Sequence, residues 1–192
     1  MSEATVPVAV LDANVLYSAS LRHLLIWLAV TEAFDARWTS AIQDEWTQSL
    51  LADQPHLDAK KIARTRQLMD KFIPDGLVTG YEARIPSLTL PDVDDRHVLA
   101  AAIHCGASVI VTKNLKDFPT SVLAEFGIEP LHPDAFVSRL LDENPAAVIE
   151  AVRLHRADLK NPPRSPAEYI GALETQDMPA TAAALRLRMT DL

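Results

Sequence analysis

Three aspartates crowd into four positions of the stretch "PDVDDRHVLAAA" at residues 91–102, directly before an apolar run. Carboxylates this close repel one another, by ~1 kcal/mol per pair in water and by several times more in a drier site. One explanation is a solvated helix cap, since aspartate is favoured near helix N-termini. The other is a cation site, in which a bound metal offsets the repulsion among Asp92, Asp94 and Asp95.

Further acids follow the two clearest strand candidates. The apolar run at residues 6–11 leads directly into Asp12, and the run at residues 108–111 leads into "VTKNLKDF". In a parallel sheet, right-handed crossovers bring both carboxyl ends to one edge, where open sheets bind their ligands. The helix that begins near Asp95 precedes the second strand, so it begins at that same edge. We therefore expect these side chains to cluster: Asp12, Asp95, Asp117 and one of Asp92 and Asp94.

An acid-rich site of this kind favours a hard divalent cation. Carboxylate oxygens suit Mg²⁺ or Mn²⁺ better than Zn²⁺. The six histidines form no HExxH pattern, and we expect His97 and His104 to have structural roles. One or two Mg²⁺ ions held by carboxylates can bind a phosphodiester and promote its hydrolysis. A helical acid in "SAIQDEWTQ" is a further candidate, but periodicity does not separate Asp44 from Glu45.

The composition narrows the class of protein. The 192 residues, 48% of them hydrophobic, suit one domain with a small addition. The net charge of −8 argues against nucleic-acid binding by a generally basic surface. None of the five glycines forms GxxxxGK[ST] or GxGxxG, which excludes a glycine-rich phosphate loop. The single Cys105 cannot form an internal disulfide, and we find neither a signal peptide nor a membrane-spanning run. These features predict a cytoplasmic protein without a membrane partner.

The elements that must position the acids alternate between strands and helices. Weaker strands are predicted in "IEPLHP" and near residues 77–79. Helices are predicted around the spaced leucines of residues 21–28, after a capping box at Ser40 and Gln43, and over residues 58–73, 98–103 and 134–141. The helix at 58–73 has an apolar face of Ile62, Met69, Phe72 and Ile73. This alternation predicts a three-layer α/β/α fold with a mainly parallel central sheet.

The last part of the chain has a different character. Residues 145–192 contain no strand candidate and carry six basic and six acidic residues. Ser165, Pro166 and Glu168 have the spacing of a capped helix start, and "MPATAAALRLRM" begins another helix. We therefore predict an α/β domain over residues 1–144 and a C-terminal helical extension over residues 145–192.

Several motifs together are similar to one family. "VLDANVLYS", the "DEW" about one helix later and "PDVDDRHVLAAAIHCGASVIVTKNLKDF" resemble a PIN-domain ribonuclease over roughly residues 5–140. The fit is best with bacterial PIN proteins of the VapC toxin type, and the tail "LKNPPRSPAEYIGALE" resembles the helical extension of one subgroup. The resemblance implies that residues 1–144 are a PIN-like nuclease domain with three or four active-site acids.

The resemblance also implies which residues form the site. Asp12, Glu45 and Asp95 match the family's acids, and Asp117 fills the fourth position, where many relatives have an acid at the position of Asn114. All four are expected to be catalytic metal ligands. The remaining site residues are expected to act in two groups. Supporting residues are Asn14, Thr112, Asn114, Asp92 and Asp94, and residues that contact RNA phosphates are Arg96, Lys113 and Lys116.

We therefore expect a Mg²⁺- or Mn²⁺-dependent endoribonuclease that is the toxin of a type II toxin–antitoxin system. The resemblance implies an RNA substrate cut to 3′-hydroxyl and 5′-phosphate ends, a homodimer, and an antitoxin that covers the acidic site. The alternative is a PIN-like protein that binds RNA or a partner without cutting, which would lack one acid. A haloacid-dehalogenase-type phosphatase is disfavoured, because its chemistry expects an aspartate where this chain has Asn14.

Overall fold

A four-stranded parallel sheet forms the centre of the fold. The computed structural model describes residues 6–192. The strands are β1 (Val8–Leu11), β2 (Asp35–Arg37), β3 (Val109–Val111) and β4 (Glu129–Leu131), in the order β2-β1-β3-β4. Every neighbouring pair is parallel. The central strands β1 and β3 are almost entirely apolar because helices cover both faces of the sheet.

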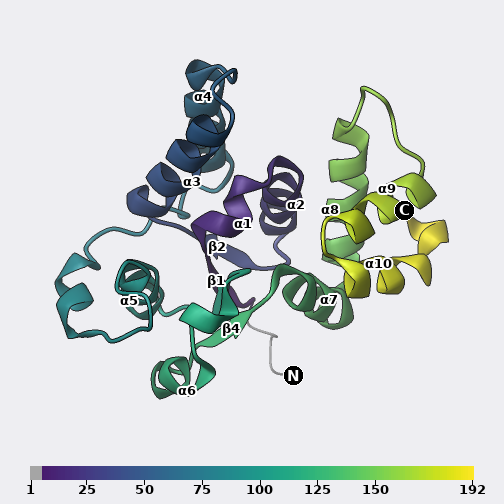
Figure 1. The fold of residues 1–192 in the computed structure, drawn as a ribbon. Helices are drawn as coiled ribbons and strands as arrows, with labels where there is room; N and C mark the ends of the chain where they lie inside the picture. The colour runs from purple at the N-terminus through teal and green to yellow at the C-terminus, as the bar shows by residue number, and fades with distance from the viewer. Residues whose placement is uncertain (1–5) are drawn as a thin grey trace.

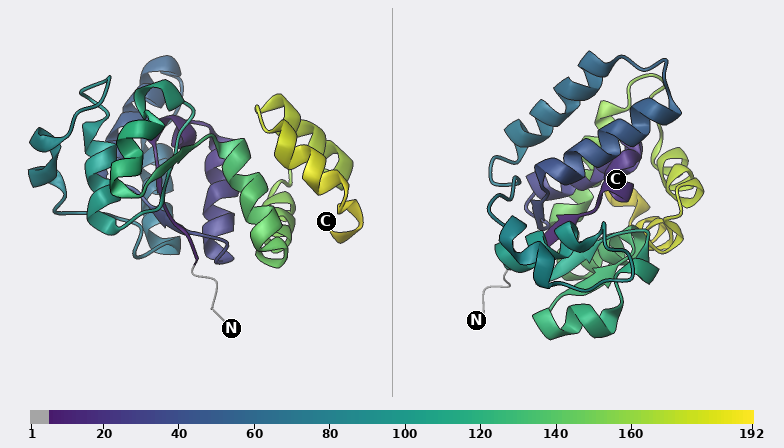
Figure 2. Two further views of the ribbon diagram at one scale, coloured as in Figure 1. Left: turned by 90° about the horizontal axis from the view of Figure 1, so that it is seen from below. Right: turned by 60° about the vertical axis from the view of Figure 1, so that its left-hand side comes forward.

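Helices enclose this sheet as two outer layers, which confirms the predicted α/β/α fold (Figures 1 and 2). Helix α5 (Arg96–Cys105) packs on β1 and β3 from one side, and α6 (Thr120–Leu123) packs on β4. Helices α2 (Ala19–Val30) and α7 (Pro133–Glu143) lie on the other side. A short helix, α1 (Ala13–Tyr17), directly follows β1, and α3 (Ser40–Asp53) and α4 (Ala59–Phe72) form a helical hairpin.

Three local predictions were wrong in detail. The first strand begins at Val8 and not at residue 6. The residue that caps α3 is Thr39, whose hydroxyl accepts a hydrogen bond from the backbone N–H of Ile42 at 3.1 Å. The cap thus lies one residue before Ser40, and the predicted box of Ser40 and Gln43 does not form, because the third helical residue is Ile42. Residues 77–79 form no strand, because Leu77 makes only an isolated bridge with Trp38.

Two further features escaped the sequence patterns. Strand β2 is only three residues long and places small Ala36 between two charged residues, so it lacks the β-branched run that marked β1 and β3. Phe72 was expected on the apolar face of α4, but it is 54% exposed at the end of that helix. Met69 and Ile73 are buried as predicted.

Residues 145–192 form three α-helices and a short 3-10 helix (Met189–Asp191), and they pack against the rest of the described chain (Figure 1). The α-helices are α8 (Pro145–Asp158), α9 (Pro166–Thr175) and α10 (Pro179–Arg186). The capping box at α9 is confirmed, since the backbone N–H of Ser165 donates to Glu168 Oε2 at 2.8 Å and the backbone N–H of Glu168 donates to Ser165 Oγ at 3.3 Å. Helix α8 packs on α2 and α7, and α10 packs on α7. Among residues 6–192, no helix has the length and apolar character that crossing a bilayer requires.

Asp134, on α7, holds the N-terminal end of α10. Its carboxylate accepts hydrogen bonds from the backbone N–H groups of Ala180 at 2.9 Å and Thr181 at 2.7 Å, and Asp134 is 8% exposed. The residue at the N-cap position of α10, Met178, provides no side-chain cap. A carboxylate from α7 therefore satisfies backbone donors that α10 cannot satisfy itself.

Replacing Asp134 by alanine is expected to lower the free energy of unfolding by about 2–3 kcal/mol, because the buried N–H group of Thr181 and the partly buried one of Ala180 lose a charged acceptor. For a chain of this length the melting temperature should fall by roughly 5–10 °C. Thermal unfolding followed by circular dichroism measures the change. Asp142→Ala is the matched control, since Asp142 is an exposed acid on the same helix. Equal melting temperatures for the two variants would contradict the role of Asp134.

Candidate metal centre

The carboxyl ends of β1 and β3 meet at one edge of the sheet. Leu11 is paired with Val111, and the backbone N–H of Asp12 donates to the carbonyl of Val111 at 3.1 Å. The next residue after each strand is polar: Asp12 follows β1 and Thr112 follows β3. Thr112 Oγ1 donates a hydrogen bond to Asp12 Oδ2 at 2.7 Å. The two strands thus join residues that lie 100 positions apart in the sequence.

Asp12 is a carboxylate held in place from several directions. It caps α1 by accepting from the backbone N–H of Ala13 at 2.7 Å, and Asn14 Nδ2 donates to both Asp12 Oδ2 and Thr112 Oγ1. Asn14 Oδ1 accepts from the backbone N–H of Lys113 at 2.9 Å. Burial raises the pKa of Asp12, and the hydrogen bonds from Thr112 and Ala13 oppose that rise. At 4% exposure, this carboxylate is positioned at the edge with little access to solvent.

A second group of acids lies at the start of α5 and after β3. Carboxylate oxygens of Asp92, Asp95 and Asp117 all lie within 4.8 Å of one another. Asp117 is further held by Asn114, whose Nδ2 donates to Asp117 Oδ2. The structure therefore joins Asp92 and Asp117 to Asp95, and of the two acids that the sequence left open for this cluster it is Asp92, not Asp94, that lies with them.

The helix-cap explanation does not account for Asp95. Asp95 occupies the N-cap position of α5, but its side chain accepts no capping hydrogen bond. Its buried Oδ2 has no hydrogen-bond partner among the residues that the structure describes. Asp92, by contrast, accepts a local hydrogen bond from the backbone N–H of Asp94 at 2.9 Å, and Asp94 itself is exposed. Buried carboxylate oxygens normally have partners, so the bare Oδ2 of Asp95 indicates a missing ligand.

The electrostatics of Asp95 give the same indication. Burial and then the charges of Asp12, Asp92, Asp117 and Glu45 raise its pKa to about 6. Five acids thus act on one small volume at the edge of the sheet. A divalent cation in that volume would relieve both the repulsion and the desolvation, since its charge favours the ionised carboxylates.

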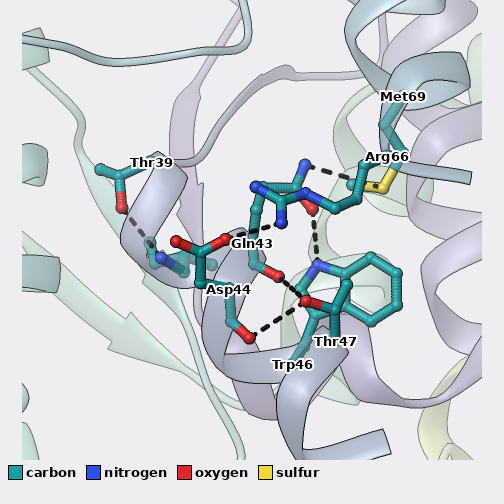
Figure 3. Close-up of polar contacts among 8 residues, drawn as sticks. Thr39, Gln43, Asp44, Trp46, Thr47, Arg66 and Met69 are labelled. Carbon is teal, nitrogen blue, oxygen red and sulfur yellow. Dashed lines mark hydrogen bonds and ion pairs between the residues drawn. The ribbon is translucent and has the colours of Figure 1, made fainter. Parts of the chain in front are cut away.

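Glu45, and not Asp44, turns toward this edge from the first turns of α3. Its Oε1 lies 2.7 Å from His97 Nε2 on α5. Asp44 instead accepts from Arg66 at 2.6 Å, on the side of α3 that faces α4 (Figure 3). In the same figure Gln43 and Trp46 are joined by a buried hydrogen bond that fixes the inner face of α3. The tertiary contacts thus separate two acids that the helical periodicity left equivalent, and Glu45 is the one that the resemblance to the family indicated.

His97 is a site residue that the sequence patterns missed. Burial lowers its pKa, but the hydrogen bond and charge of Glu45, with Asp12 and Asp95, outweigh burial, so that the pKa is raised overall. Its signal in the sequence was only its place two residues after Asp95. The other candidates lie around the acids: Arg96 donates to the carbonyl of Val93, and Lys113 and Lys116 are exposed.

His97→Gln is expected to weaken divalent-metal binding by roughly 10- to 100-fold, because residues that orient a metal ligand typically contribute this much. Titration calorimetry with Mn²⁺ measures the affinity. His104→Gln, an exposed position on the same helix, is the matched control. If both variants bind Mn²⁺ as tightly as the parent, the pair of His97 and Glu45 has no part in metal binding.

Known proteins match both parts of the chain. A family model described as PIN domain matches residues 8–116, and one described as VapC50 C-terminal domain matches residues 133–187. The protein named "Putative ribonuclease VapC50" from Mycobacterium tuberculosis (strain ATCC 25618 / H37Rv) is 41% identical over 119 residues, which are 59% of this chain and 69% of that protein. No solved structure matches the chain.

The two family matches follow the structure closely. The first covers β1, β2, α5 and β3, and with them most of the acids at the edge of the sheet; the second covers α7 to α10. Helix α7 therefore falls within the second match, whereas the predicted division at residue 144 stays a prediction. Since the PIN-domain match spans more than half of the residues, the chain belongs to the PIN-domain family, and its C-terminal helices form a domain of the VapC50 type.

Proposed function

We propose that the chain is a Mg²⁺-dependent endoribonuclease and the toxin of a type II toxin–antitoxin system. The observation that carries the proposal is the buried Oδ2 of Asp95, which has neither a cap nor a hydrogen-bond partner among the described residues and lies beside Asp92 and Asp117. The family match and the name of the relative support cleavage of RNA.

The proposed metal ligands are Asp12, Glu45, Asp95 and Asp117. Asp92 is added to them because its carboxylate lies within 4.8 Å of those of Asp95 and Asp117. Oxygen donors alone fit Mg²⁺ or Mn²⁺, and a cation held here would supply charge stabilisation and activation of water for phosphodiester hydrolysis.

The chain's own polar residues keep these acids in place. Thr112 and Asn14 hold Asp12, and Asn114 holds Asp117. His97 holds Glu45. Because Asp12, Glu45 and Asp117 are each held by a neighbouring side chain, their oxygens are arranged before any metal or substrate arrives, which lowers the cost of binding.

The basic residues near the acids are proposed to contact RNA. Lys113 and Lys116 follow β3, and Arg96 lies next to Asp95, so all three are beside the proposed centre. Exposed cations in such places can hold phosphates on either side of the scissile bond. Beyond the RNA, we propose a cytoplasmic homodimer and an antitoxin that covers the acidic site.

Cleavage of RNA with and without metal tests the proposed function. The purified chain should cut RNA with Mg²⁺ and lose that activity in EDTA. Asp12→Asn and Glu45→Gln should abolish cleavage, since each removes a charged ligand at nearly constant shape. Asp44→Asn is the matched control, because this neighbouring acid pairs with Arg66 on another side of α3. Cleavage that persists in both ligand variants would mean that the activity comes from a contaminant.

A further inference from the structure

Helix α4 concentrates positive charge in an otherwise acidic chain. Five of the 18 lysines and arginines lie within its 14 residues, together with a single acid, Asp70. The chain as a whole has a net charge of −8, so the residues outside α4 are more acidic still. A helix of this composition is poorly suited to the core and must present its charges to something else.

Only one of these cations is used within the described part of the chain. Arg66 points to α3 and pairs with Asp44 at 2.6 Å (Figure 3). Lys60, Lys61, Arg64 and Lys71 are exposed, and none forms an ion pair within residues 6–192. The pair on the inner side fixes how α4 is turned, and the remaining cations stay available.

Three of the free cations form a continuous line, which we call the basic stripe: Lys60, Arg64 and Lys71, with Gln67 between them. Positions separated by four, seven and eleven residues fall on one side of an α-helix, since each residue turns the helix by about 100°. Buried Met69 lies on a different side of α4. The stripe is about 16 Å long at 1.5 Å per residue.

The stripe leads toward the acidic edge of the sheet. Trp38, directly after β2, donates from Nε1 to Asp70 Oδ1 at 3.2 Å, which joins the last turn of α4 to the carboxyl end of a parallel strand. The same edge carries Asp12 after β1 and Thr112 after β3. Helix α4 lies at the periphery beside α3 (Figures 1 and 2), so its outer side is open along its length.

We propose that the basic stripe binds the phosphate backbone of single-stranded RNA and guides it to the acidic site. This inference rests on the proposed function, because it assigns a surface to the RNA of that same site. An acidic protein that repels a polyanion needs a local cationic surface to hold it, and α4 provides a row of unpaired cations. At about 3.4 Å per phosphate on a helical strand, the stripe spans roughly four or five phosphates.

Binding of RNA in EDTA tests the stripe without any dependence on cleavage. Fluorescence anisotropy would follow a labelled single-stranded RNA of about 12 nucleotides, a length typical of such sites. The triple variant Lys60→Gln, Arg64→Gln, Lys71→Gln is expected to bind roughly tenfold more weakly, and the slope of log K against log salt should fall by about 2, at 0.7 per lost phosphate contact.

The matched control removes the same charge elsewhere. Arg153→Gln, Lys160→Gln, Arg188→Gln removes the same charge from the C-terminal region, residues 145–192, and should leave both affinity and slope unchanged. Equal weakening in the two triple variants, no weakening in the first, or no binding of RNA by the parent would overturn the proposal. If the stripe variant lost binding to polyglutamate but bound RNA as tightly as the parent, the proposal would also be overturned, and the stripe would be assigned to an acidic protein partner.

The cleavage assay separates this proposal from the proposed function. If the parent binds RNA through the stripe but never cuts it with Mg²⁺, the stripe stands and the nuclease assignment fails. If the parent cuts RNA and the stripe variant binds and cuts equally well, the nuclease assignment stands and the stripe fails.

Discussion

Replacing Asp95 by asparagine is expected to abolish metal-dependent RNA cleavage and, at the same time, to stabilise the metal-free protein. The activity should fall by on the order of 10³-fold, beyond the roughly 10- to 100-fold typical of residues that merely orient a ligand. Stability should rise because the variant removes a negative charge that burial and four neighbouring acids disfavour. A functional residue that costs stability is common at active sites.

The gain in stability should depend on pH in a defined direction. The pKa of Asp95 is about 6 in the folded protein and 3.8 ordinarily, so the folded state binds the extra proton between these values. This proton stabilises the folded parent at low pH, and the parent loses that stabilisation as the pH rises through about 6. The difference in melting temperature between Asp95→Asn and the parent should grow from pH ~4 to pH ~6 and then level off.

Comparison with the parent is needed because the titration of another buried group, His155, changes the stability with pH in the opposite direction. His155 is 1% exposed, and burial lowers its pKa to about 4. Its contribution to stability is lost as the pH falls toward that value, and it is the same in both proteins. Asp94→Asn is the matched control for charge, since Asp94 is exposed beside Asp95. An equal gain in the two variants would show that general acidity, and not the cluster, is responsible.

Adding Mg²⁺ or Mn²⁺ to the parent is expected to raise its melting temperature at neutral pH. A ligand at 100 times its dissociation constant stabilises the folded state by about 2.7 kcal/mol. In a chain of this length that corresponds to roughly 5–10 °C. The effect should be much smaller near pH 5, because a protonated Asp95 cannot act as a charged ligand.

Differential scanning fluorimetry at several pH values, with EDTA as the reference, measures this stabilisation. Asp95→Asn should show little of it at any pH, whereas Asp94→Asn should behave like the parent. A metal-induced shift of the same size at pH 5 and pH 7.5, or one that persists in Asp95→Asn, would place the metal elsewhere in the chain.

The sequence by itself determined the layered fold and the edge at which the acids gather. Its β-branched runs before Asp12 and Thr112 identified β1 and β3, because strands buried on both faces must be apolar along their whole length. The capping box before α9 was equally readable, since its hydrogen bonds join residues only three positions apart. Local signals of this kind need no knowledge of the rest of the chain.

The tertiary structure alone supplied the contacts that distinguish the acids from one another. Glu45 differs from Asp44 because His97, on another helix, lies 2.7 Å from one and Arg66 lies 2.6 Å from the other. Asp95 differs from Asp94 because Asp95 is half-buried, with its Oδ2 fully buried, near acids that come from distant strands and helices, whereas Asp94 is exposed. A carboxylate's role depends on its burial and on its charged neighbours, and when those neighbours are far away in the chain, only folding brings them together.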